Sequence, residues 1–363
     1  MQQRYLVLTA SMGAGHDQVA DELARRLRRQ GADSQVVDLL QVLPAHIGPA
    51  LRRGYAWMLR SAPWLYDLIY RVFFVPRDHV QPSTSPLVML AASRLAPVIR
   101  DYRPTVVVST FHLAGQVTGR LRASGRLDAI AAVVVTEAVA HALWLDAGND
   151  LFLTLFPALA EQAAERTGKP ALAPGPVVDE RFLLGANPCR GARRLGLGDG
   201  DQAVIVSTGS WGVGSAEHIA AELVGLPGIR PVVLCGQNEA LQTAAGRVPG
   251  AIALGWRDDL PDIFAAATVL IDNAGGSMCL EALASGLPVI AHRPIPGHGG
   301  PAVAALAAAG LAAWAGDDDA LRAHVERLRH PGADRAALVE AGRAIFAADP
   351  AAVLADWVQD RCR

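Results

Sequence analysis

The sequence predicts an α/β protein of two doubly wound domains that face a central cleft. The first observation is an alternation of short, β-branched apolar runs with helix-length stretches, which is typical of a parallel sheet covered by helices. The second is a segment rich in proline and glycine at 170–188, after which the same alternation starts again. The third is the length of 363 residues, which suits two domains. We therefore expect an N-terminal domain over 1–180, a second domain over 190–335, and C-terminal helices over 336–363 that pack back on the first.

The elements of the first domain follow in order from its apolar runs. The expected strands lie at 5–10, 34–40, 105–110, 129–136 and 151–156. A helix follows the first strand, because Val19, Leu23 and Leu27 recur at four-residue spacing. The outer face of this helix carries Glu22 and Arg26 four residues apart, and we expect them to form an exposed ion pair.

The second domain repeats the pattern. Its expected strands lie at 203–210, 231–236, 251–256, 268–276 and 287–294. Beyond residue 315 the chain is predicted to be mostly helical. Ligands of doubly wound sheets lie beyond the carboxyl ends of the strands, so we expect a site in the cleft between the domains.

Composition excludes several classes of protein. The chain has 33 Lys and Arg against 35 Asp and Glu, a net charge of −2, which argues against a nucleic-acid partner. Its 51% apolar content is too high for disorder, and no apolar run is long enough to cross a bilayer. The opening residues lack the long apolar region of a signal peptide, so we expect a cytoplasmic protein. Widely spaced cysteines favour reduced thiols over a zinc site or a disulfide framework; they are Cys189, Cys235, Cys279 and Cys362.

The segment 44–80 interrupts the alternation of strands and helices. It holds 7 of the chain's 20 aromatic residues, interleaved with arginines. The aromatic residues are Tyr55, Trp57, Trp64, Tyr66, Tyr70, Phe73 and Phe74, and the arginines are Arg52, Arg53, Arg60, Arg71 and Arg77. This composition suits an anionic membrane surface, where rings lie at headgroup depth and arginines meet phosphates. A helical pair packed on its own domain fits equally well.

The glycine turn after the first strand resembles a dinucleotide-binding loop only in part. Gly13 and Gly15 are present, and Asp38 stands where a ribose-binding acid belongs. The third glycine position holds Gln18, however, which argues against a dinucleotide. What remains is a helix N-terminus that bears His16, as a general base, a phosphate contact or a helix cap.

Three glycine-marked strand ends in the second half predict a diphosphate site without a metal ion. The loops lie at 207–215, 272–288 and 293–300. In the second of them a helix begins near Ser277, and its amides and positive dipole end suit a nucleoside diphosphate. Glu281 lies one turn inside that helix, where a carboxylate can accept the hydroxyls of a ribose, although an internal helix glutamate is more often on the surface. His298 stands among glycines in the third loop, which is able to close over a sugar.

These motifs together carry a family resemblance. GAGH after the first strand, TGSWGVG, CGQNE, LGWRDDL, NAGGSMCLEALASGLPVI and RPIPGHG resemble the monogalactosyldiacylglycerol-synthase-like glycosyltransferases. The chain is also similar to the bacterial enzyme that adds N-acetylglucosamine to the lipid-linked peptidoglycan precursor. The resemblance implies a GT-B fold of two Rossmann-like domains. It also implies inverting transfer from a UDP-sugar, no metal or other cofactor, and a membrane-bound lipid acceptor.

The resemblance also assigns roles to residues. It places the donor nucleotide at Gly209, Ser210, Trp256, Arg257, Gly275, Gly276, Ser277 and Glu281, and the donor sugar at His298 and Gly299. The acceptor side comprises Gly13, Gly15, His141 and Trp144, together with the motif histidine His16. The family's Thr-Asp pair is here Thr136-Glu137, so His16 and Glu137 are both candidates for the catalytic base. The ordinary pKa of histidine, about 6.5, favours His16, whereas Glu137 would need burial.

We therefore expect transfer of a hexosyl group from a UDP-sugar to a hydroxyl of a membrane lipid or lipid-linked acceptor. The enzyme is expected to lie peripherally on the inner face of the cell membrane. Transfer to a soluble natural product, a UDP-sugar epimerase and a nucleotide-sugar-binding protein remain alternatives. A metal-dependent transferase would need an Asp-X-Asp motif at a strand end, but Asp199 to Asp201 and Asp317 to Asp319 fit turn or cap positions. The sugar, the acceptor and the oligomeric state are left open.

Overall fold

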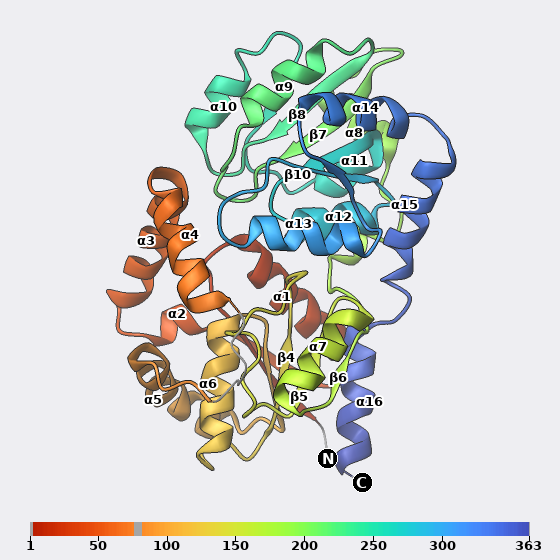
Figure 1. Ribbon diagram of the computed structural model, residues 1–363. Coiled ribbons are helices and arrows are strands. Elements are labelled where there is room, and N and C mark those ends of the chain that lie inside the picture. The colour runs from red at the N-terminus through yellow and green to blue at the C-terminus, as the bar shows by residue number, and fades with distance from the viewer. Residues whose placement is uncertain (1–2, 76–81, 363) are drawn as a thin grey trace. The chain divides into compact units, whose positions relative to one another are not determined.

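The computed structural model describes residues 3–75 and 82–362 as two compact units (Figure 1). Unit 1 comprises Met1–Met58, Leu68–Val177 and Ile345–Arg363. Unit 2 comprises Leu59–Asp67 and Val178–Ala344. The chain thus enters unit 2 twice, once for a short excursion at Leu59–Asp67 and once for the whole second sheet.

Unit 1 is built on a parallel sheet of six strands in the order β2-β1-β3-β4-β5-β6. Its strands are β1 (Arg4–Thr9), β2 (Asp33–Asp38), β3 (Val106–Ser109), β4 (Ile130–Val134), β5 (Leu151–Leu153) and β6 (Ala171–Leu172). Its helices are α1 (Ala14–Arg29), α2 (Leu39–Val42), α5 (Pro86–Tyr102), α6 (His112–Ala123), α7 (Pro157–Thr167) and α16 (Pro350–Cys362). One core lies between the sheet and α5 and α6, and the other between the sheet and α1 and α16. Both faces are covered, which explains why the inner strands β1, β3, β4 and β5 are mostly apolar.

A helical excursion leaves unit 1 between β2 and β3. It consists of α3 (Ile47–Ser61), α4 (Pro63–Ile69) and the π-helical turn η1 (Tyr70–Phe74). The turn between α3 and α4 lies within Leu59–Asp67 and therefore belongs to unit 2. We call α3 and α4 together the hairpin. Residues 76–80 of the predicted aromatic segment, with Arg77 among them, lie outside the described residues.

Unit 2 holds a second parallel sheet of six strands in the order β12-β11-β10-β7-β8-β9. Its strands are β7 (Gln202–Ser207), β8 (Ile229–Leu234), β9 (Ile252–Leu254), β10 (Ala267–Asp272), β11 (Val289–His292) and β12 (Ala313–Ala315). Its helices are η2 (Glu180–Phe182), α8 (Pro188–Leu195), α9 (Ala216–Val224), α10 (Glu239–Ala245), α11 (Leu260–Ala266), α12 (Ser277–Ala284), α13 (Gly299–Ala308), α14 (Asp318–Leu328) and α15 (Ala333–Ala344). Helices α9 and α14 share a core with one face of the sheet.

The two doubly wound α/β units confirm the predicted fold class. Strands β6 and β12 were not predicted, since strands of two and three residues leave little pattern in a sequence. The second predicted strand ends early, at Asp38, because the Asp38 side chain accepts from the Leu40 N–H and caps α2.

The predicted exposure of the Glu22–Arg26 pair is wrong. Arg26 Nε donates to Glu22 Oε1 at 2.7 Å, and both side chains are buried. The same guanidinium lies 3.1 Å from Asp349, the residue before α16. The C-terminal helix covers this face of α1, so a pair that looks solvated in the sequence becomes part of the α1–α16 contact.

None of the helices within the described residues is long and apolar enough to span a membrane.

Candidate functional site

The candidate site of unit 1 lies beyond the carboxyl ends of β1, β3 and β4. Helix α1 begins there after Gly13, whose backbone is extended and which has no described side-chain cap. Gly15 and His16 fall in its first turn. Asp38, at the end of β2, accepts from the N–H groups of Ser11 and Leu40. Its carboxylate therefore joins the residues after β1 to the start of α2. Both hydrogen bonds are made to Oδ1.

His16 is held by residues that follow β3 and β4. Its Nδ1 lies 3.0 Å from the carbonyl oxygen of Thr110 and 3.1 Å from the hydroxyl of Thr136. A carbonyl only accepts, so this hydrogen bond assigns the proton to Nδ1 and makes Nε2 the basic nitrogen of the neutral ring. The Phe111 ring meets the imidazole edge-on, with centroids 4.8 Å apart. The ring of His16 is therefore held by Thr110 and Thr136. The N-cap position of α1 is taken by Gly13, so His16 is not the cap residue.

Glu137 lies next to Thr136, so the structure brings both candidate bases to one place. Its side chain is 21% exposed, and its Oε2 lies 3.5 Å from Nε2 of the buried His141. The ring of Trp144 lies near both histidines of the site, with centroids 6.0 Å from His141 and 6.3 Å from His16. The residues predicted for the acceptor side thus surround the two candidate bases.

A third histidine, His112, completes this cluster and was not predicted. Its ring centroid lies 5.3 Å from that of His141 and 5.9 Å from that of Trp144. The buried atoms His112 Nδ1, His141 Nδ1 and Trp144 Nε1 find no hydrogen-bond partner among the described residues. Buried polar atoms are normally paired, so three together indicate a place for water or for a polar ligand.

Burial sets the protonation of the groups around this cluster. Burial and then the nearby His141 lower the pKa of His112 well below its ordinary value, which keeps the ring neutral at pH 7. Burial and then Glu137 raise the pKa of Tyr70 to about 12, so its phenol stays protonated. Tyr70 stacks on Phe74, with ring centroids 5.2 Å apart. The ring of His112 and the phenol of Tyr70 are therefore both uncharged at pH 7, beside the two candidate bases.

In unit 2 the loop after β7 is a turn that contains several glycines and lies at the carboxyl edge of the sheet. Gly209 and Gly212 both have left-handed backbones, with φ of 63° and 61°, which favour glycine. The carbonyl of Ser210 accepts from the Gln237 N–H at 3.1 Å. A Cβ on Gly236 would lie 2.6 Å from the Gly209 carbonyl oxygen, so two glycines are needed for the loops after β7 and β8 to meet.

The turn between β10 and α12 presents backbone N–H groups. Asp272 Oδ2 accepts from the N–H groups of Ala274, at 3.0 Å, and Gly275, at 2.5 Å, which fixes the turn. Gly275 has φ of 65°, and a Cβ there would lie 2.9 Å from Ala302. Gly276 caps α12 without a described side-chain hydrogen bond, and a Cβ on it would meet no described atom within 4 Å. The first N–H groups of α12, from Ser277 on, therefore have no described side-chain cap at the positive end of the helix, and the space beside Gly276 is open.

Glu281 lies on the second turn of α12 and is only 5% exposed. Its Oε2 has no hydrogen-bond partner among the described residues. Burial and then Asp179 raise the pKa of Glu281 to about 8, while Arg181 opposes them. A buried carboxyl with one unused oxygen can accept from a ligand hydroxyl.

Arg181, whose charge acts on Glu281, connects Asp179 to the loop after β9. Its guanidinium lies within hydrogen-bond distance of Asp179, at 2.9 Å, and 3.4 Å from the carbonyl of Asp258. Trp256, in the same loop, is 48% exposed. Arg257 donates from Nε to Asp259 at 2.7 Å, so its guanidinium braces the loop. The hydrogen bond from Arg257, helped by Arg194, lowers the pKa of Asp259 to about 2.

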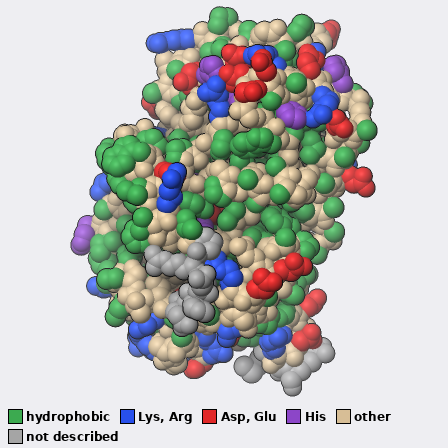
Figure 2. Space-filling view, viewed as in Figure 1, with side chains coloured by type: hydrophobic (Ala, Val, Ile, Leu, Met, Phe, Trp, Pro, Cys, Tyr) green, Lys and Arg blue, Asp and Glu red, His purple; other side chains and the backbone are tan. Residues whose placement is uncertain are grey.

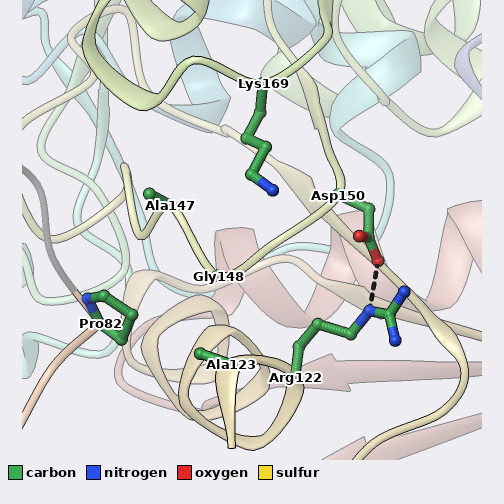
Figure 3. A pocket seen from close by; sticks show the side chains of 7 residues that line it. All are labelled: Pro82, Arg122, Ala123, Ala147, Gly148, Asp150 and Lys169. Carbon is green, nitrogen blue, oxygen red and sulfur yellow. Dashed lines mark hydrogen bonds and ion pairs between the residues drawn. The ribbon is translucent and has the colours of Figure 1, made fainter. Parts of the chain in front are cut away.

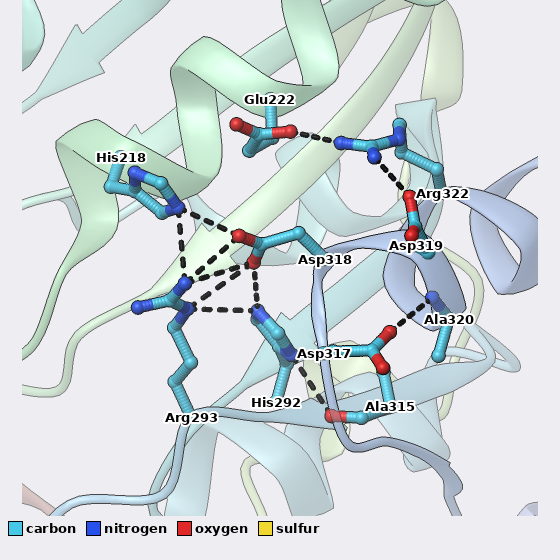
Figure 4. A network of polar contacts seen from close by, with 10 residues as sticks. All are labelled: His218, Glu222, His292, Arg293, Ala315, Asp317, Asp318, Asp319, Ala320 and Arg322. Carbon is cyan, nitrogen blue, oxygen red and sulfur yellow. Dashed lines mark hydrogen bonds and ion pairs between the residues drawn. The ribbon is translucent and has the colours of Figure 1, made fainter.

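The third loop, 293–299, is anchored at both ends. Gly299 approaches the Asn273 carbonyl so closely that a Cβ on it would lie 3.0 Å from that oxygen. Arg293 adopts a left-handed backbone with φ of 46°, and its guanidinium donates to Asp318 at 2.9 Å (Figure 4). Hydrogen bonds from His218 and Arg293 hold the pKa of Asp318 well below its ordinary value.

The same network brings three possible metal ligands together, His218, Glu222 and Asp318. Their carboxylates are already paired, since Arg293 donates to Asp318 and Arg322 donates to Glu222 (Figure 4). The acids considered for an Asp-X-Asp motif have the predicted local roles. Asp317 accepts from the Ala320 N–H and caps α14, and Asp201 accepts from the Gly198 N–H in a turn.

A separate hollow lies at the opposite, amino edge of the unit 1 sheet (Figure 3). It is lined by Pro82, Arg122, Ala123, Ala147, Gly148, Asp150 and Lys169. Arg122 donates to Asp150 at 3.0 Å across it. Doubly wound sheets bind ligands at the carboxyl edge, so we do not place the reaction here.

Sequence reasoning missed several residues of both units. His112 follows β3 directly, so the signal that selected His16, a histidine just past a strand, would also have found it. Asp179 and Arg181 lie in the proline-rich segment that was interpreted as a linker, and no local signal marks them. Asn273, whose Nδ2 donates to the Val213 carbonyl at 3.0 Å, links two glycine loops that are far apart in the sequence.

The chain is similar to known proteins both in sequence and in fold. A family model described as monogalactosyldiacylglycerol (MGDG) synthase matches residues 16–171. A processive diacylglycerol beta-glucosyltransferase of Bacillus mycoides (strain KBAB4) is 24% identical over 98% of this chain and 93% of that protein. The structure is similar to Acinetobacter baumannii MurG, with 15% identity, a TM-score of 0.59 and coverage of 99% and 100% of the two chains. It is also similar to Anabaena Alr3699/HepE in complex with UDP-glucose, with 14% identity, a TM-score of 0.59 and coverage of 99% of both.

Proposed function

We propose a reaction for this chain from its similarity to the monogalactosyldiacylglycerol-synthase-like glycosyltransferases of the GT-B fold. It moves a hexosyl group from a UDP-sugar to a hydroxyl of a membrane lipid or lipid-linked acceptor. The transfer inverts the anomeric carbon and needs no metal ion. The observation that carries the proposal is the carboxyl edge of unit 2, where a helix N-terminus without a described side-chain cap and the buried Glu281 Oε2 without a described partner lie on the same helix, α12.

The donor side follows from charge and hydrogen bonding. The diphosphate lies against the N-terminus of α12, whose first N–H groups have no described side-chain cap and whose dipole favours an anion. Each such contact contributes about 0.3–1 kcal/mol, and up to ~2 kcal/mol when partly buried. Glu281 Oε2 accepts from the ribose, and the loop at Trp256 is placed to meet the base. One similar structure holds UDP-glucose, which supports a UDP-sugar as the donor.

The metal independence rests on the same groups. The departing diphosphate needs a positive partner, and the N-terminus of α12 supplies one. The carboxylate closest along the chain, Asp272, accepts from two backbone N–H groups and holds the turn. Asp317 and Asp201, the acids of the Asp-X-Asp candidates, are engaged with backbone N–H groups of their own turns.

The acceptor side supplies the base. The acceptor hydroxyl attacks the anomeric carbon from the side opposite the diphosphate, its oxygen bonds to that carbon, and the bond to the phosphate oxygen breaks. UDP leaves with the electron pair, and the hydroxyl proton moves to Nε2 of His16. The Thr110 carbonyl, which fixes the His16 proton on Nδ1, keeps Nε2 able to take that proton. Glu137 is the alternative base, and its exposure leaves its carboxylate reachable.

The lipid nature of the acceptor is supported by the hairpin. Its exposed aromatic residues include Trp57 at 56% and Trp64 at 69% exposure. Figure 2 shows hydrophobic side chains gathered over α3 and α4. Exposed arginines, Arg52 and Arg53, lie on the same helix α3, which suits an anionic lipid surface. The similar proteins named as diacylglycerol glucosyltransferases support a diacylglycerol-like acceptor. We propose in addition that the enzyme lies on the inner face of the membrane.

The test is incubation with radiolabelled UDP-sugars in EDTA, with and without diacylglycerol vesicles. We expect label in the lipid fraction that depends on vesicles and is inverted at the anomeric carbon. An isomerised donor would indicate an epimerase, label on a soluble acceptor would indicate a natural-product transferase, and an unchanged donor would indicate a binding protein. His16→Ala is the variant expected to lose sugar transfer. His330→Ala is the matched control and is expected to keep it, because His330 is exposed in unit 2.

A further inference from the structure

The turn of the hairpin is part of unit 2, although the hairpin begins and ends in unit 1. This turn contacts two of the three glycine loops proposed to bind the donor. We call 208–215 and 293–299 the donor loops. No local pattern of the sequence predicts these contacts, because the partners lie 151 and 232 positions apart.

Arg60, at the end of α3, contacts the first donor loop. Its Nε and one terminal nitrogen donate to the Trp211 carbonyl oxygen at 3.2 and 3.1 Å. The guanidinium also lies 5.7 Å from the centre of the Trp211 ring. Two donors on one carbonyl, with a cation–π contact beside them, fix the position of the loop between Ser210 and Gly212.

Tyr66 and Asp67, in α4, contact the second donor loop. The Tyr66 hydroxyl lies 2.9 Å from His298 Nδ1, and the two rings meet edge-on. The Gly297 N–H donates to Asp67 Oδ1 at 3.2 Å. Gly297 has φ of 79°, and a Cβ on it would lie 2.5 Å from the Tyr66 ring. The loop is therefore shaped to receive this tyrosine.

The same two helices carry the exposed aromatic residues. Trp57 lies one turn before Arg60 on α3, and Trp64 lies two residues before Tyr66 on α4. Each helix of the hairpin thus carries an exposed tryptophan within three residues of a side chain that contacts a donor loop. Ordering of this hairpin by a lipid surface would be transmitted to both donor loops.

We propose that the hairpin couples an anionic lipid surface to the donor site, with Arg60 and Tyr66 as the residues that position the donor loops. This inference rests on the proposed function, because it takes those loops as the donor site. Binding of Trp57 and Trp64 at the lipid surface holds the hairpin in the arrangement that makes the Trp211 and His298 contacts. Donor binding is then tighter on a membrane than in solution.

The first test measures amide hydrogen exchange in the donor loops with and without vesicles of anionic phospholipid. In the wild type we expect vesicles to slow exchange several-fold at 209–214 and 294–299. Tyr66→Phe and Arg60→Ala should abolish most of that slowing, whereas Tyr102→Phe should retain it. Tyr102→Phe is the matched control because its hydroxyl bonds to the Tyr5 carbonyl within unit 1, whereas both donor loops belong to unit 2.

The second test separates positioning from structure by kinetics. Loss of one hydrogen bond of about 0.5–1.5 kcal/mol predicts a 2- to 10-fold rise in the donor KM for Tyr66→Phe, with a smaller change in kcat. The rise should occur with vesicles and shrink when the acceptor is presented in detergent. Trp57→Ser with Trp64→Ser should remove the vesicle effect while leaving the detergent KM unchanged.

The outcomes distinguish this inference from the proposed function. Donor loops that exchange equally with and without vesicles, or identically in the wild type and Tyr66→Phe, would overturn the coupling, whatever sugar transfer shows. Sugar transfer that fails in the wild type would overturn the proposed function, and the exchange result would still report whether the hairpin orders the loops.

Discussion

Replacing Glu281 with glutamine is expected to change how the stability of unit 2 depends on pH. Burial raises the pKa of Glu281 to about 8 from the ordinary value of 4.5. Between these two values the folded protein holds the proton and the unfolded chain has released it. The free energy of unfolding therefore falls by about 1.4 kcal/mol for each pH unit in that window, and it is constant below pH 4.5. Glutamine carries no proton and has no such dependence.

The magnitude follows from the width of the window. From pH 5.5 to pH 8.5 the wild type should lose about 3 kcal/mol relative to Glu281→Gln. For a unit of this size 1 kcal/mol corresponds to roughly 2–4 °C in Tm, so the gap in Tm should widen by about 6–12 °C. The glutamine side chain has its own cost of burial, but that cost is the same at every pH and cancels in the comparison.

The assay is thermal unfolding of both proteins at closely spaced pH values. Glu239→Gln is the control, since Glu239 is exposed on α10 in the same unit. We expect the Tm gap of Glu281→Gln to grow with pH and that of Glu239→Gln to stay constant. A Tm gap for Glu281→Gln that is equal at pH 5.5 and pH 8.5 would refute the buried, protonated carboxyl.

Three further predictions concern the base, the diphosphate turn and the lipid surface. His16→Ala should lower kcat by about 10²- to 10⁴-fold at saturating substrates, and Glu137→Gln by much less; the reverse order would assign the base to Glu137. Gly275→Ala should weaken UDP binding in calorimetry and destabilise unit 2 by about 1–3 kcal/mol in urea unfolding, since its backbone is left-handed and the space beside it is filled. Trp57→Ser with Trp64→Ser should reduce sedimentation with anionic vesicles several-fold, and undiminished sedimentation would place the lipid contact elsewhere.

The elements of both sheets were predictable because their signals are local. Apolar runs marked all strands except β6 and β12, and the glycines after β7 and β10 marked the turns that the structure shows. His16 was found for the same reason, since a histidine in the first turn after a strand is visible without the fold. Its orientation by the Thr110 carbonyl was not visible, because that contact joins residues 94 positions apart.

Tertiary contacts account for what the sequence did not show. Glu22 and Arg26 have the spacing of a surface pair, and only the position of α16 reveals that they are buried. Arg181 lies in a segment with the composition of a linker, yet it faces the surroundings of Glu281. The aromatic segment was correctly expected to form helices, but its contacts with Trp211 and His298 depend on which unit holds the turn.

Calorimetric titration with UDP in EDTA tests the central claim most directly, because it asks whether the glycine-lined edge of unit 2 binds the nucleotide product without a metal. We predict saturable one-to-one binding of UDP, with an affinity that magnesium does not increase. ADP should bind more weakly than UDP, and Gly275→Ala should weaken the binding of UDP. Binding that requires magnesium, equal binding of ADP, or no heat of binding with UDP would contradict the account.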